Sequence, residues 1–264
     1  MMLNTVERSR LYAEGLSVSY GNRTILPNLD IAIPDTKITV IIGPNACGKS
    51  TLLRSLARLK SPSSGQVVLD GKNIAKWKTR KVAQTLGILP QMPSAPEGIR
   101  VFDLVERGRT PYQSIARQWS KRDAEAVQSA LEMTDMLDHA DRFVQDLSGG
   151  QRQRAWIAMA LAQETELLLL DEPTTFLDLS HQIDVLNLIR RLNRDARRTV
   201  VMVLHDINLA ARYADHLIAL KDGAVIVEGS VQTVVTENVI EDVFDMTCKV
   251  LNDPFNNSPI VIPV

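Results

Sequence analysis

The segment Gly43–Thr51 constrains the fold of this 264-residue chain more strongly than any other feature. Its sequence, GPNACGKST, matches the phosphate-loop pattern G-x-x-x-x-G-K-[ST]. The apolar, β-branched run 37–42 precedes it and predicts a central strand. Leucines at helical spacing follow it and predict a helix; they are Leu52, Leu53, Leu56 and Leu59. Because the motif requires this strand–loop–helix context, a phosphate-binding loop is a better interpretation than a plain glycine turn with a surface lysine.

The loop predicts a role for each of its parts. Backbone N–H groups cradle phosphates, Lys49 reaches the β- and γ-phosphates, and the Ser50 hydroxyl holds Mg²⁺. The candidate nucleotide-binding residues are Gly43, Pro44, Asn45, Ala46, Cys47, Gly48, Lys49, Ser50 and Thr51.

Two adjacent carboxylates follow a second apolar run. Leu167–Leu170 predicts a buried strand, and Asp171 and Glu172 stand at its carboxyl end, where open α/β sheets bind ligands. Two acids are costly there unless a cation offsets them. Asp171 therefore suits Mg²⁺ coordination, and Glu172 suits the general base or the orienter of an attacking water. The alternative, a solvated pair at a strand end, is disfavoured by the leucines and the phosphate loop.

The pentapeptide Leu147–Gln151 (LSGGQ) has the features of an anion site. Ser148 is a good N-cap for the helix predicted over 151–163, and Gly149 and Gly150 let the backbone approach a ligand closely. Unpaired N–H groups and the helix dipole both favour negative charge at such an end. Alone, the pentapeptide would be better interpreted as a capped turn; the phosphate loop upstream and the acidic strand end downstream favour the anion site.

Three further residues are ambiguous when each is taken alone. His205 follows the predicted strand 200–204, where it can contact a γ-phosphate or cap the next helix. Gln91 follows the predicted strand 86–89 and has a similarly weak case on its own. Tyr20 ends a strand-like run and can stack on an adenine face or pack within the sheet.

The order of the elements predicts the fold class. Strands alternate with helices, which favours an α/β fold with a parallel sheet and helices on its faces. Residues from about 92 to 164 form a predicted helical insert, with helices over 123–137 and 151–163. Lys221-Asp222-Gly223 separates two apolar runs and predicts a hairpin.

Composition restricts the partners and the compartment. The net charge of −1 provides no overall attraction for nucleic acid, so no nucleic-acid partner is expected. Cys47 and Cys248 are too few for a disulfide framework and lack metal-ligand spacing, which suits a reducing cytoplasm. No run resembles a secretion signal or a bilayer-spanning segment, so any membrane role is expected to come through a partner.

Taken together, the motifs resemble the nucleotide-binding subunit of an ATP-binding cassette (ABC) transporter over nearly the full chain. Tyr20 matches the A-loop aromatic, Gly43–Thr51 Walker A, Gln91 the Q-loop, Leu147–Gln151 the signature motif, Leu167–Glu172 Walker B, Leu177-Asp178 the D-loop and His205 the switch histidine.

This resemblance implies one domain over residues 1–264. Its P-loop NTPase (RecA-like) core has a mainly parallel sheet, with an N-terminal antiparallel β subdomain and an inserted helical subdomain. It also implies a head-to-tail homodimer that holds two ATP molecules, each between Walker A of one subunit and the signature motif of the other. The implied catalytic residues are Glu172, His205 and Gln91, the implied Mg²⁺ ligands are Ser50, Gln91 and Asp171, and the further nucleotide contacts are Ser148, Gly149, Gly150, Gln151 and Asp178. Two residues depart from the usual pattern: Ala46 stands where many members have Gly, and Phe176 stands where a small residue is usual.

The segments Val101–Tyr112, Gln151–Met159 and Thr174–Gln182 narrow the resemblance to bacterial importers of ferric siderophores, haem and cobalamin. The match is closest to ATPases of ferric-siderophore uptake, including the ferric-enterobactin type. Such a subunit lies on the cytoplasmic face of the inner membrane, binds integral permease subunits and is served indirectly by a substrate-binding protein. Haem or cobalamin import, or a non-transport role such as cluster assembly, is the alternative. The arginines of the insert either dock a membrane subunit or form a solvated basic face; they are Arg100, Arg107, Arg109, Arg117 and Arg122.

Overall fold

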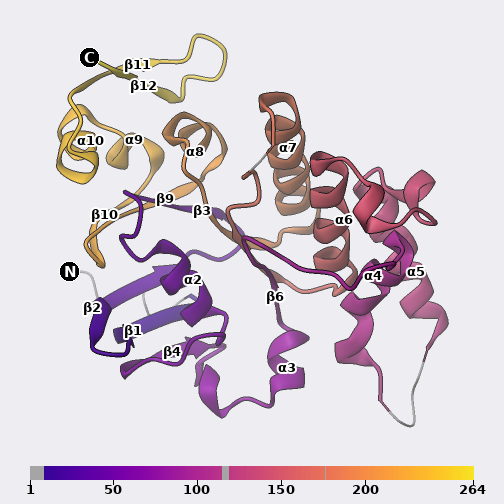
Figure 1. The fold of residues 1–264 in the computed structure, drawn as a ribbon. Coiled ribbons are helices and arrows are strands. Elements are labelled where there is room, and N and C mark those ends of the chain that lie inside the picture. Colours follow the sequence, from indigo (N-terminus) through magenta and orange to yellow (C-terminus); the bar gives the residue numbers. More distant parts are fainter. Residues whose placement is uncertain (1–8, 115–118, 176) are drawn as a thin grey trace. The chain divides into compact units, whose positions relative to one another are not determined.

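The computed structural model describes residues 9–114, 119–175 and 177–264, so that the expectations on Arg117 and Phe176 lie outside the described residues. The chain folds into two compact units (Figure 1). We call residues 1–77 with 199–264 the phosphate-loop unit and residues 78–198 the helical unit. The predicted helical subdomain over about 92–164 stays a prediction, because the helical unit also includes flanking strands and a further helix.

An antiparallel sheet forms one layer of the phosphate-loop unit. Its strands, in the order β2-β1-β4-β5, are β2 (Arg23–Ile33), β1 (Leu11–Tyr20), β4 (Ser64–Leu69) and β5 (Lys72–Asn73), and the short 3₁₀ helix η1 (Ile74–Lys76) follows. Burial alternates along β2 at Leu29, Ile31 and Ile33, as the sequence predicts for a half-buried strand. The expected N-terminal antiparallel β subdomain is confirmed.

A second sheet of this unit is built around β3. The strand β3 (Ile38–Ile42) pairs in parallel with β8 (Thr199–Val203) and β9 (His216–Lys221), and β10 (Ala224–Gly229) pairs antiparallel with β9. Every residue of β3 and β8 is buried, which agrees with sequences that are β-branched throughout except for Met202. Helix α2 (Lys49–Leu56) lies between the two sheets, in contact with β1, β2 and β8 (Figure 1). The phosphate loop is thereby fixed between a buried strand and a buried helix.

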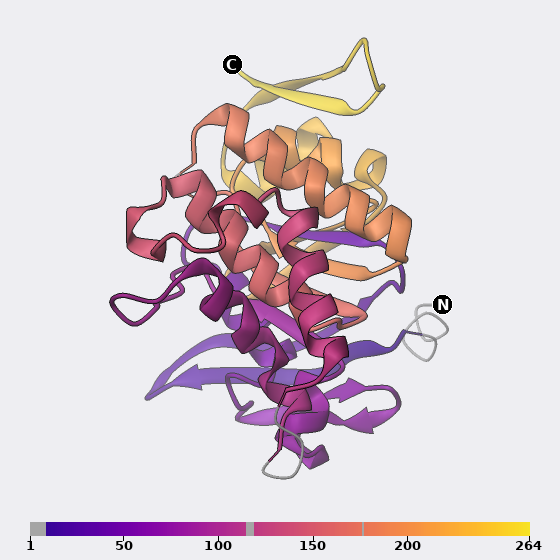
Figure 2. The same ribbon diagram turned by 90° about the vertical axis from the view of Figure 1, so that its right-hand side faces the viewer.

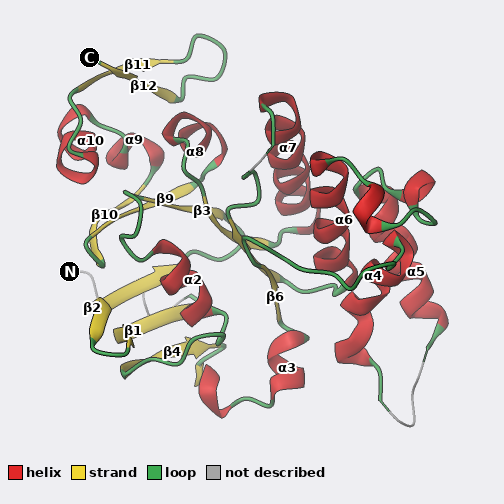
Figure 3. Cartoon of the chain, in the orientation of Figure 1, coloured by secondary structure: helices red, strands yellow, loops and turns green. Residues whose placement is uncertain are grey.

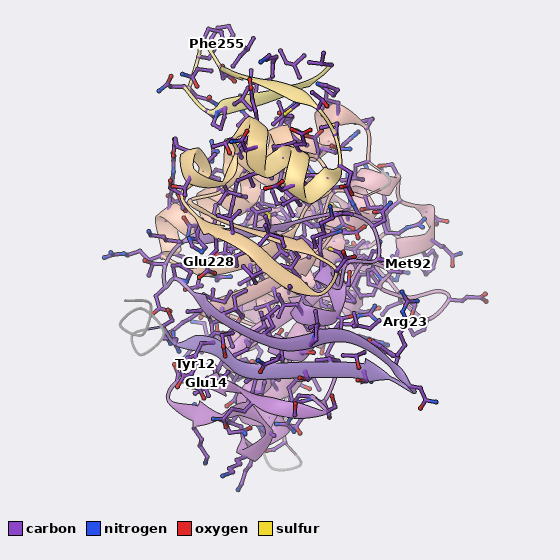
Figure 4. All side chains as sticks on the ribbon, turned by 90° about the vertical axis from the view of Figure 1, so that its left-hand side faces the viewer. Tyr12, Glu14, Arg23, Met92, Glu228 and Phe255 are labelled. Carbon is purple, nitrogen blue, oxygen red and sulfur yellow. The ribbon has the colours of Figure 1, made fainter. Side chains whose placement is uncertain are left out.

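The remainder of the phosphate-loop unit is made by the last part of the chain. It comprises α8 (Ile207–Tyr213), α9 (Val231–Val234), α10 (Glu237–Phe244), β11 (Cys248–Asn252) and β12 (Pro259–Pro263). Strands β11 and β12 form a separate hairpin, and Figure 4 shows Phe255 at its tip, where its side chain is exposed. The Asn208 side chain holds this hairpin against α8 by hydrogen bonds to both backbone polar groups of Val261.

The helical unit contains α3 (Thr79–Ala83), β6 (Leu86–Leu89), α4 (Val101–Glu106), η2 (Arg107–Tyr112), α5 (Lys121–Met133), η3 (Leu137–His139), η4 (Val144–Asp146), α6 (Gly149–Ala162), β7 (Leu167–Asp171) and α7 (Leu179–Ala196). Helix α6 packs against both α4 and α5, and Figure 2 shows these helices next to one another. Strands β6 and β7 pair in parallel, and all five residues of β7 are buried. Figure 3 shows how helix predominates in this part of the chain. The parallel pairs β3–β8, β3–β9 and β6–β7 confirm the predicted α/β class.

Within the described part of the chain, no helix is both long and apolar enough to cross a membrane.

Candidate functional site

The phosphate loop takes a path that only glycine permits at two positions. Gly43 and Gly48 have φ of 150° and 107°. A Cβ at Gly43 would lie 2.1 Å from the Leu220 carbonyl oxygen, and one at Gly48 would lie 2.7 Å from Leu26 Cδ2. The loop is therefore a close-packed cradle of backbone, with Lys49 and Ser50 beginning α2 directly after it. This geometry fits a phosphate group, which backbone N–H groups and a helix N-terminus bind well.

Lys49 is held over the loop that precedes it. Its side chain is buried, and its Nζ donates to the carbonyl oxygens of Gly43 at 2.9 Å and Pro44 at 2.7 Å. Burying an ammonium group costs free energy, and the two carbonyl acceptors offset part of that cost. The fold therefore holds a positive charge next to the loop. The predicted contact of Lys49 with phosphate oxygens stays a prediction.

Two other residues of the loop clarify its tolerance for side chains. Ala46 has φ of 62° and is exposed, so that its Cβ is accommodated, as expected for this departure from Gly. Cys47 is buried, and its carbonyl accepts from Gly223 N–H at 3.0 Å, which joins the loop to the β9–β10 turn. Burial raises the pKa of the Cys47 thiol above its ordinary value, although the nearby Lys49 charge acts in the opposite direction.

Tyr20 and His205 belong to the same unit. Tyr20 ends β1 with its side chain 45% exposed, and Lys60 Nζ lies 4.0 Å from the ring centroid, so the ring is not packed within the sheet. His205 follows β8 and is exposed. Asp206, not His205, caps α8, because its side chain accepts from Leu209 N–H at 2.8 Å. Helix capping therefore does not account for His205.

The two acids at the end of β7 are buried in the helical unit. Asp171 is 1% exposed and Glu172 is 8% exposed, so the alternative of a solvated strand-end pair is wrong. Glu172 has φ of 54°, a left-handed conformation that is strained for a side chain of this size. Such strain persists only where the surroundings fix the residue, and Glu172 is fixed by its neighbours.

Those neighbours hold one carboxylate oxygen. Gln91 Nε2 donates to Glu172 Oε2 at 2.5 Å, and Thr175 Oγ1 donates to the same oxygen at 3.0 Å. The structure thus brings the predicted residues Gln91 and Glu172 into contact. Thr175 is not among the predicted site residues. The sequence signal for it is its position three residues after Glu172, in the segment between β7 and α7.

The signature motif begins α6 with a reciprocal cap. Ser148 Oγ accepts from Gln151 N–H at 3.2 Å, and Gln151 Oε1 accepts from Ser148 N–H at 3.1 Å. Gln151 Nε2 also lies 3.2 Å from His139 Nε2. Ser148 and Gly149 are exposed, whereas Gly150 is buried against His181. The start of α6 is thus rigid, with its first residues open to a ligand.

Asp178 caps the next helix, α7. Its Oδ1 accepts from His181 N–H at 3.0 Å, from Ser180 Oγ at 2.9 Å and from His181 Nδ1 at 2.6 Å. These bonds, led by that from the His181 backbone, lower the pKa of Asp178 to about 2. Asp178 is therefore a firmly ionised, exposed carboxylate, and its predicted contact with nucleotide stays a prediction.

The donor groups also suit a magnesium ion. Hydroxyl, carboxylate and amide oxygens are the ligands that Mg²⁺ prefers, and Ser50, Asp171 and Gln91 supply one of each. No cluster of three or more His, Cys, Asp or Glu with metal-binding geometry occurs among the described residues. Each of the three side chains is thus of a type that suits Mg²⁺, and their joint role as its ligands stays a prediction.

One expectation about the helical unit is wrong. Arg109 neither docks a partner nor faces solvent, because it is fully buried and its Nε bonds Asp123 Oδ1 at 2.9 Å. Arg100, in contrast, is exposed, with its guanidinium 5.2 Å from the Phe143 ring centroid, and Arg122 is 72% exposed.

Comparison with known families shows which family this chain belongs to. The family model described as ABC transporter matches residues 26–175, more than half of the chain. This chain belongs to the ABC transporter family. The match confirms the resemblance inferred from the motifs and begins in β2, shortly before the phosphate loop.

Two curated relatives resemble this ABC transporter family member over almost its whole length. The "Probable siderophore transport system ATP-binding protein YusV" of Bacillus subtilis (strain 168) is 56% identical over 97% of this chain and 93% of its own. The "Ferric enterobactin transport ATP-binding protein FepC" of Escherichia coli (strain K12) is 49% identical over 97% of this chain and 94% of its own.

Solved structures agree on the fold. An inward-facing conformation of a putative metal-chelate type ABC transporter has a TM-score of 0.84 and 28% identity, covering 97% of each chain. The dimeric structure of MJ0796, a bacterial ABC transporter cassette, has a TM-score of 0.74 and 28% identity, covering 83% of this chain and 98% of that one. The expected α/β architecture of an ABC cassette is confirmed.

Proposed function

We propose that this protein is the ATP-hydrolysing subunit of a bacterial ABC importer that takes up a ferric siderophore through a partner permease. The observation that carries the enzymatic part is the buried Glu172 carboxylate, held by Gln91 and Thr175 in a chain that also has a complete phosphate loop. The assignment of a siderophore as cargo is supported by two relatives that are siderophore and ferric-enterobactin transport ATP-binding proteins. They are 56% and 49% identical to this chain over nearly its whole length.

Each residue acts on one part of the nucleotide in this proposal. Tyr20 stacks on the adenine, the loop amides and Lys49 bind the phosphates, and Ser50, Asp171 and Gln91 hold Mg²⁺. When bound, the ion neutralises charge on the β- and γ-phosphate oxygens. Glu172 orients the attacking water and takes its proton, and His205 contacts the γ-phosphate. The products are ADP and inorganic phosphate.

Two copies of the chain complete the proposed assembly. Ser148, Gly149, Gly150 and Gln151 of one copy face the γ-phosphate held by the other copy, with Asp178 beside them. The dimeric structure of MJ0796 supports the pairing of two copies. The subunit binds integral permease subunits at the cytoplasmic face of the inner membrane, a placement supported by relatives that are ATP-binding proteins of transport systems. A substrate-binding protein acts upstream and does not touch this subunit.

Two alternative functions remain for the same ATPase. A haem or cobalamin importer would use the same hydrolytic site, since the cargo does not contact this subunit. A non-transport ABC ATPase, such as a cluster-assembly factor, would co-purify with soluble partners and not with a permease.

Growth on a defined iron source tests the proposal. Deleting the gene should abolish growth on a ferric siderophore as sole iron source and leave growth on freely available iron intact. Wild-type chain should restore growth, and the matched Lys49→Ala variant should not, because it lacks the phosphate-binding cation. Unchanged uptake of labelled siderophores in the deletion strain would show that the cargo is not a ferric siderophore.

A further inference from the structure

The N-termini of helices α6 and α7 meet at His181 in the helical unit. The imidazole ring covers Gly150 of the signature motif: a Cβ on Gly150 would lie 2.6 Å from His181 Cδ2 and 3.0 Å from its Cγ. Gly150 has helical backbone angles, so its lack of a side chain is not explained by backbone conformation. The missing Cβ is explained by the space that the ring occupies.

The other side of the same ring is bonded to the D-loop. His181 Nδ1 lies 2.6 Å from Asp178 Oδ1, and the His181 N–H donates to the same oxygen at 3.0 Å. Because the ionised Asp178 carboxylate only accepts, Nδ1 carries the proton and donates. The bond fixes both the tautomer and the orientation of the ring, in the way that a carboxylate orients a metal-ligating or catalytic histidine.

We propose that His181 is a positioning residue that joins the D-loop to the signature motif, so that the two segments move as one piece. The inference rests on the proposed function, in which both segments face the nucleotide held by the second copy. A loss of the ring would leave Asp178 and Gly150 free to shift independently. Small misplacements of groups around a transferred phosphoryl are costly to rate, whereas they alter ground-state binding much less.

An ion pair between the same two helices provides an internal control. Arg154 of α6 donates to Asp184 of α7 at 3.0 Å, about one turn further along each helix. This ion pair is partly exposed and touches neither motif, since it lies beyond Gly150 and Asp178 in both helices. Asp184→Asn therefore weakens the packing of α6 on α7 and leaves the His181 contacts in place.

The test uses the full chain and measures phosphate release across a range of Mg-ATP concentrations. His181→Ala should lower kcat about tenfold with KM changed less than about twofold, because the phosphate loop that binds ATP is untouched. His181→Asn keeps a donor near the Nδ1 position and loses the ring, and His181→Phe keeps a ring and loses the donor. Each should lower kcat, because the link needs both contacts. Asp184→Asn should leave kcat within about twofold.

A double-mutant cycle separates positioning from a general structural effect. In an Asp178→Ala background, His181→Ala should cause little further loss of kcat, because the link is already broken. Thermal unfolding of every variant shows whether the fold is intact. The inference is overturned if His181→Ala retains wild-type kcat, if Asp184→Asn lowers kcat equally, or if the Asp178 and His181 losses simply multiply. A wild-type chain that releases no phosphate would instead overturn the proposed function itself, and the inference with it.

Discussion

At the residue scale, the clearest arrangement is the pair of donors on Glu172. A carboxylate that serves as a base must be held in one orientation, and Gln91 and Thr175 do this through one oxygen, which leaves Oε1 without either of these donors. The left-handed φ of Glu172 adds to this picture, because strain of this kind is retained where the local structure fixes a residue for function. The backbone also contributes, since Thr175 N–H donates to the Glu172 carbonyl.

Thr175 gives the first prediction. Thr175→Val keeps the shape of the side chain and removes the hydroxyl that donates to Glu172 Oε2, so the carboxylate is less well oriented. We expect kcat for ATP hydrolysis to fall about tenfold with little change in KM, in line with the value of positioning. Thr175→Ser, which keeps the hydroxyl, is the matched control and should retain most activity. Equal activity of Val and Ser variants in a phosphate-release assay would remove the hydroxyl from the mechanism.

Cys47 gives a prediction that depends on pH. Because burial raises its pKa above the ordinary value of 9.0, the thiolate is a small fraction at neutral pH, and the thiolate is the reactive form. Alkylation by a bulky maleimide should therefore be slow at pH 7 and accelerate about tenfold per pH unit up to the raised pKa. Modification should inactivate the ATPase, and Mg-ATP should protect it.

The Cys47→Ser variant controls for the other thiol. Cys248 is also buried with a raised pKa, so its modification is slow for the same reason. Cys47→Ser should keep ATPase activity and lose its sensitivity to the reagent. If that variant is inactivated at the wild-type rate, the reactive group lies elsewhere, and the close-packed loop is not the cause.

At the scale of elements, one buried ion pair organises the helical unit. Arg109 of η2 bonds Asp123 of α5 and the Ala162 carbonyl at the end of α6, and its guanidinium lies 4.1 Å from the Tyr112 ring centroid. Burial alone would raise the pKa of Asp123, but hydrogen bonds from Ser120 and Arg109 outweigh it and lower that pKa. Three segments that are distant in sequence are thus joined through one side chain.

This arrangement predicts a large loss of stability on removing the arginine. Arg109→Met leaves the buried Asp123 charge without its partner and should lower the free energy of unfolding by about 3–5 kcal/mol. The matched control is Arg122→Met: Arg122 is 72% exposed and lies 3.5 Å from Glu164, so its loss should cost about 1 kcal/mol or less. Urea unfolding measures both. Equal effects would mean that burial of the pair is not what stabilises the unit. The double variant Arg109→Met, Asp123→Leu should recover part of the loss, because the buried Asp123 charge is gone and Glu164, the other partner of Arg109, keeps Arg122 at 3.5 Å.

The extent of these elements shows what sequence can and cannot predict. Periodic leucines predict a helix through Leu59, yet α2 ends at Leu56, because Arg58 takes a left-handed conformation with φ of 60°. The predicted helix 123–137 begins earlier, at Lys121, where Ser120 and Asp123 form a capping box, and ends at Met133, before the left-handed Asp135. Apolar periodicity predicts that a helix exists, whereas its ends depend on caps and single backbone angles that the pattern does not contain.

The residues of the candidate site also fall into those that the sequence predicts and those that it does not. The phosphate loop, the acids after β7 and the signature serine could be predicted, because each combines a residue type with a position at the end of an element. The roles of Thr175 and His181 could not, since both act through contacts made by a turn and a ring between helices. The expectation that Arg109 is exposed, which follows from the usual behaviour of basic side chains, is wrong, because Arg109 is fully buried.

At the scale of the whole molecule, the family and the two motif-bearing units predict an assembly that forms only with nucleotide. In the proposed function, ATP is bound by the phosphate loop of one copy and by the signature motif of another, so that ATP contributes much of the interface. Hydrolysis removes the γ-phosphate, and the two copies then lose the group that joins them. The dimer is therefore expected to last only as long as ATP stays intact.

The Glu172→Gln variant tests this. It keeps the size of the side chain and removes the charge that accepts the proton, so turnover should fall about a hundredfold or more. ATP binding should survive, because Lys49, Ser50 and Asp171 are unchanged. With hydrolysis blocked, the variant should elute from size exclusion as a dimer in ATP and as a monomer without it. Lys49→Ala lacks the cation that binds the phosphates, so it should stay monomeric both with and without ATP. A Glu172→Gln protein that releases phosphate at the wild-type rate would remove this residue from the mechanism. A dimer that forms equally without ATP would mean that protein contacts alone hold the two copies together.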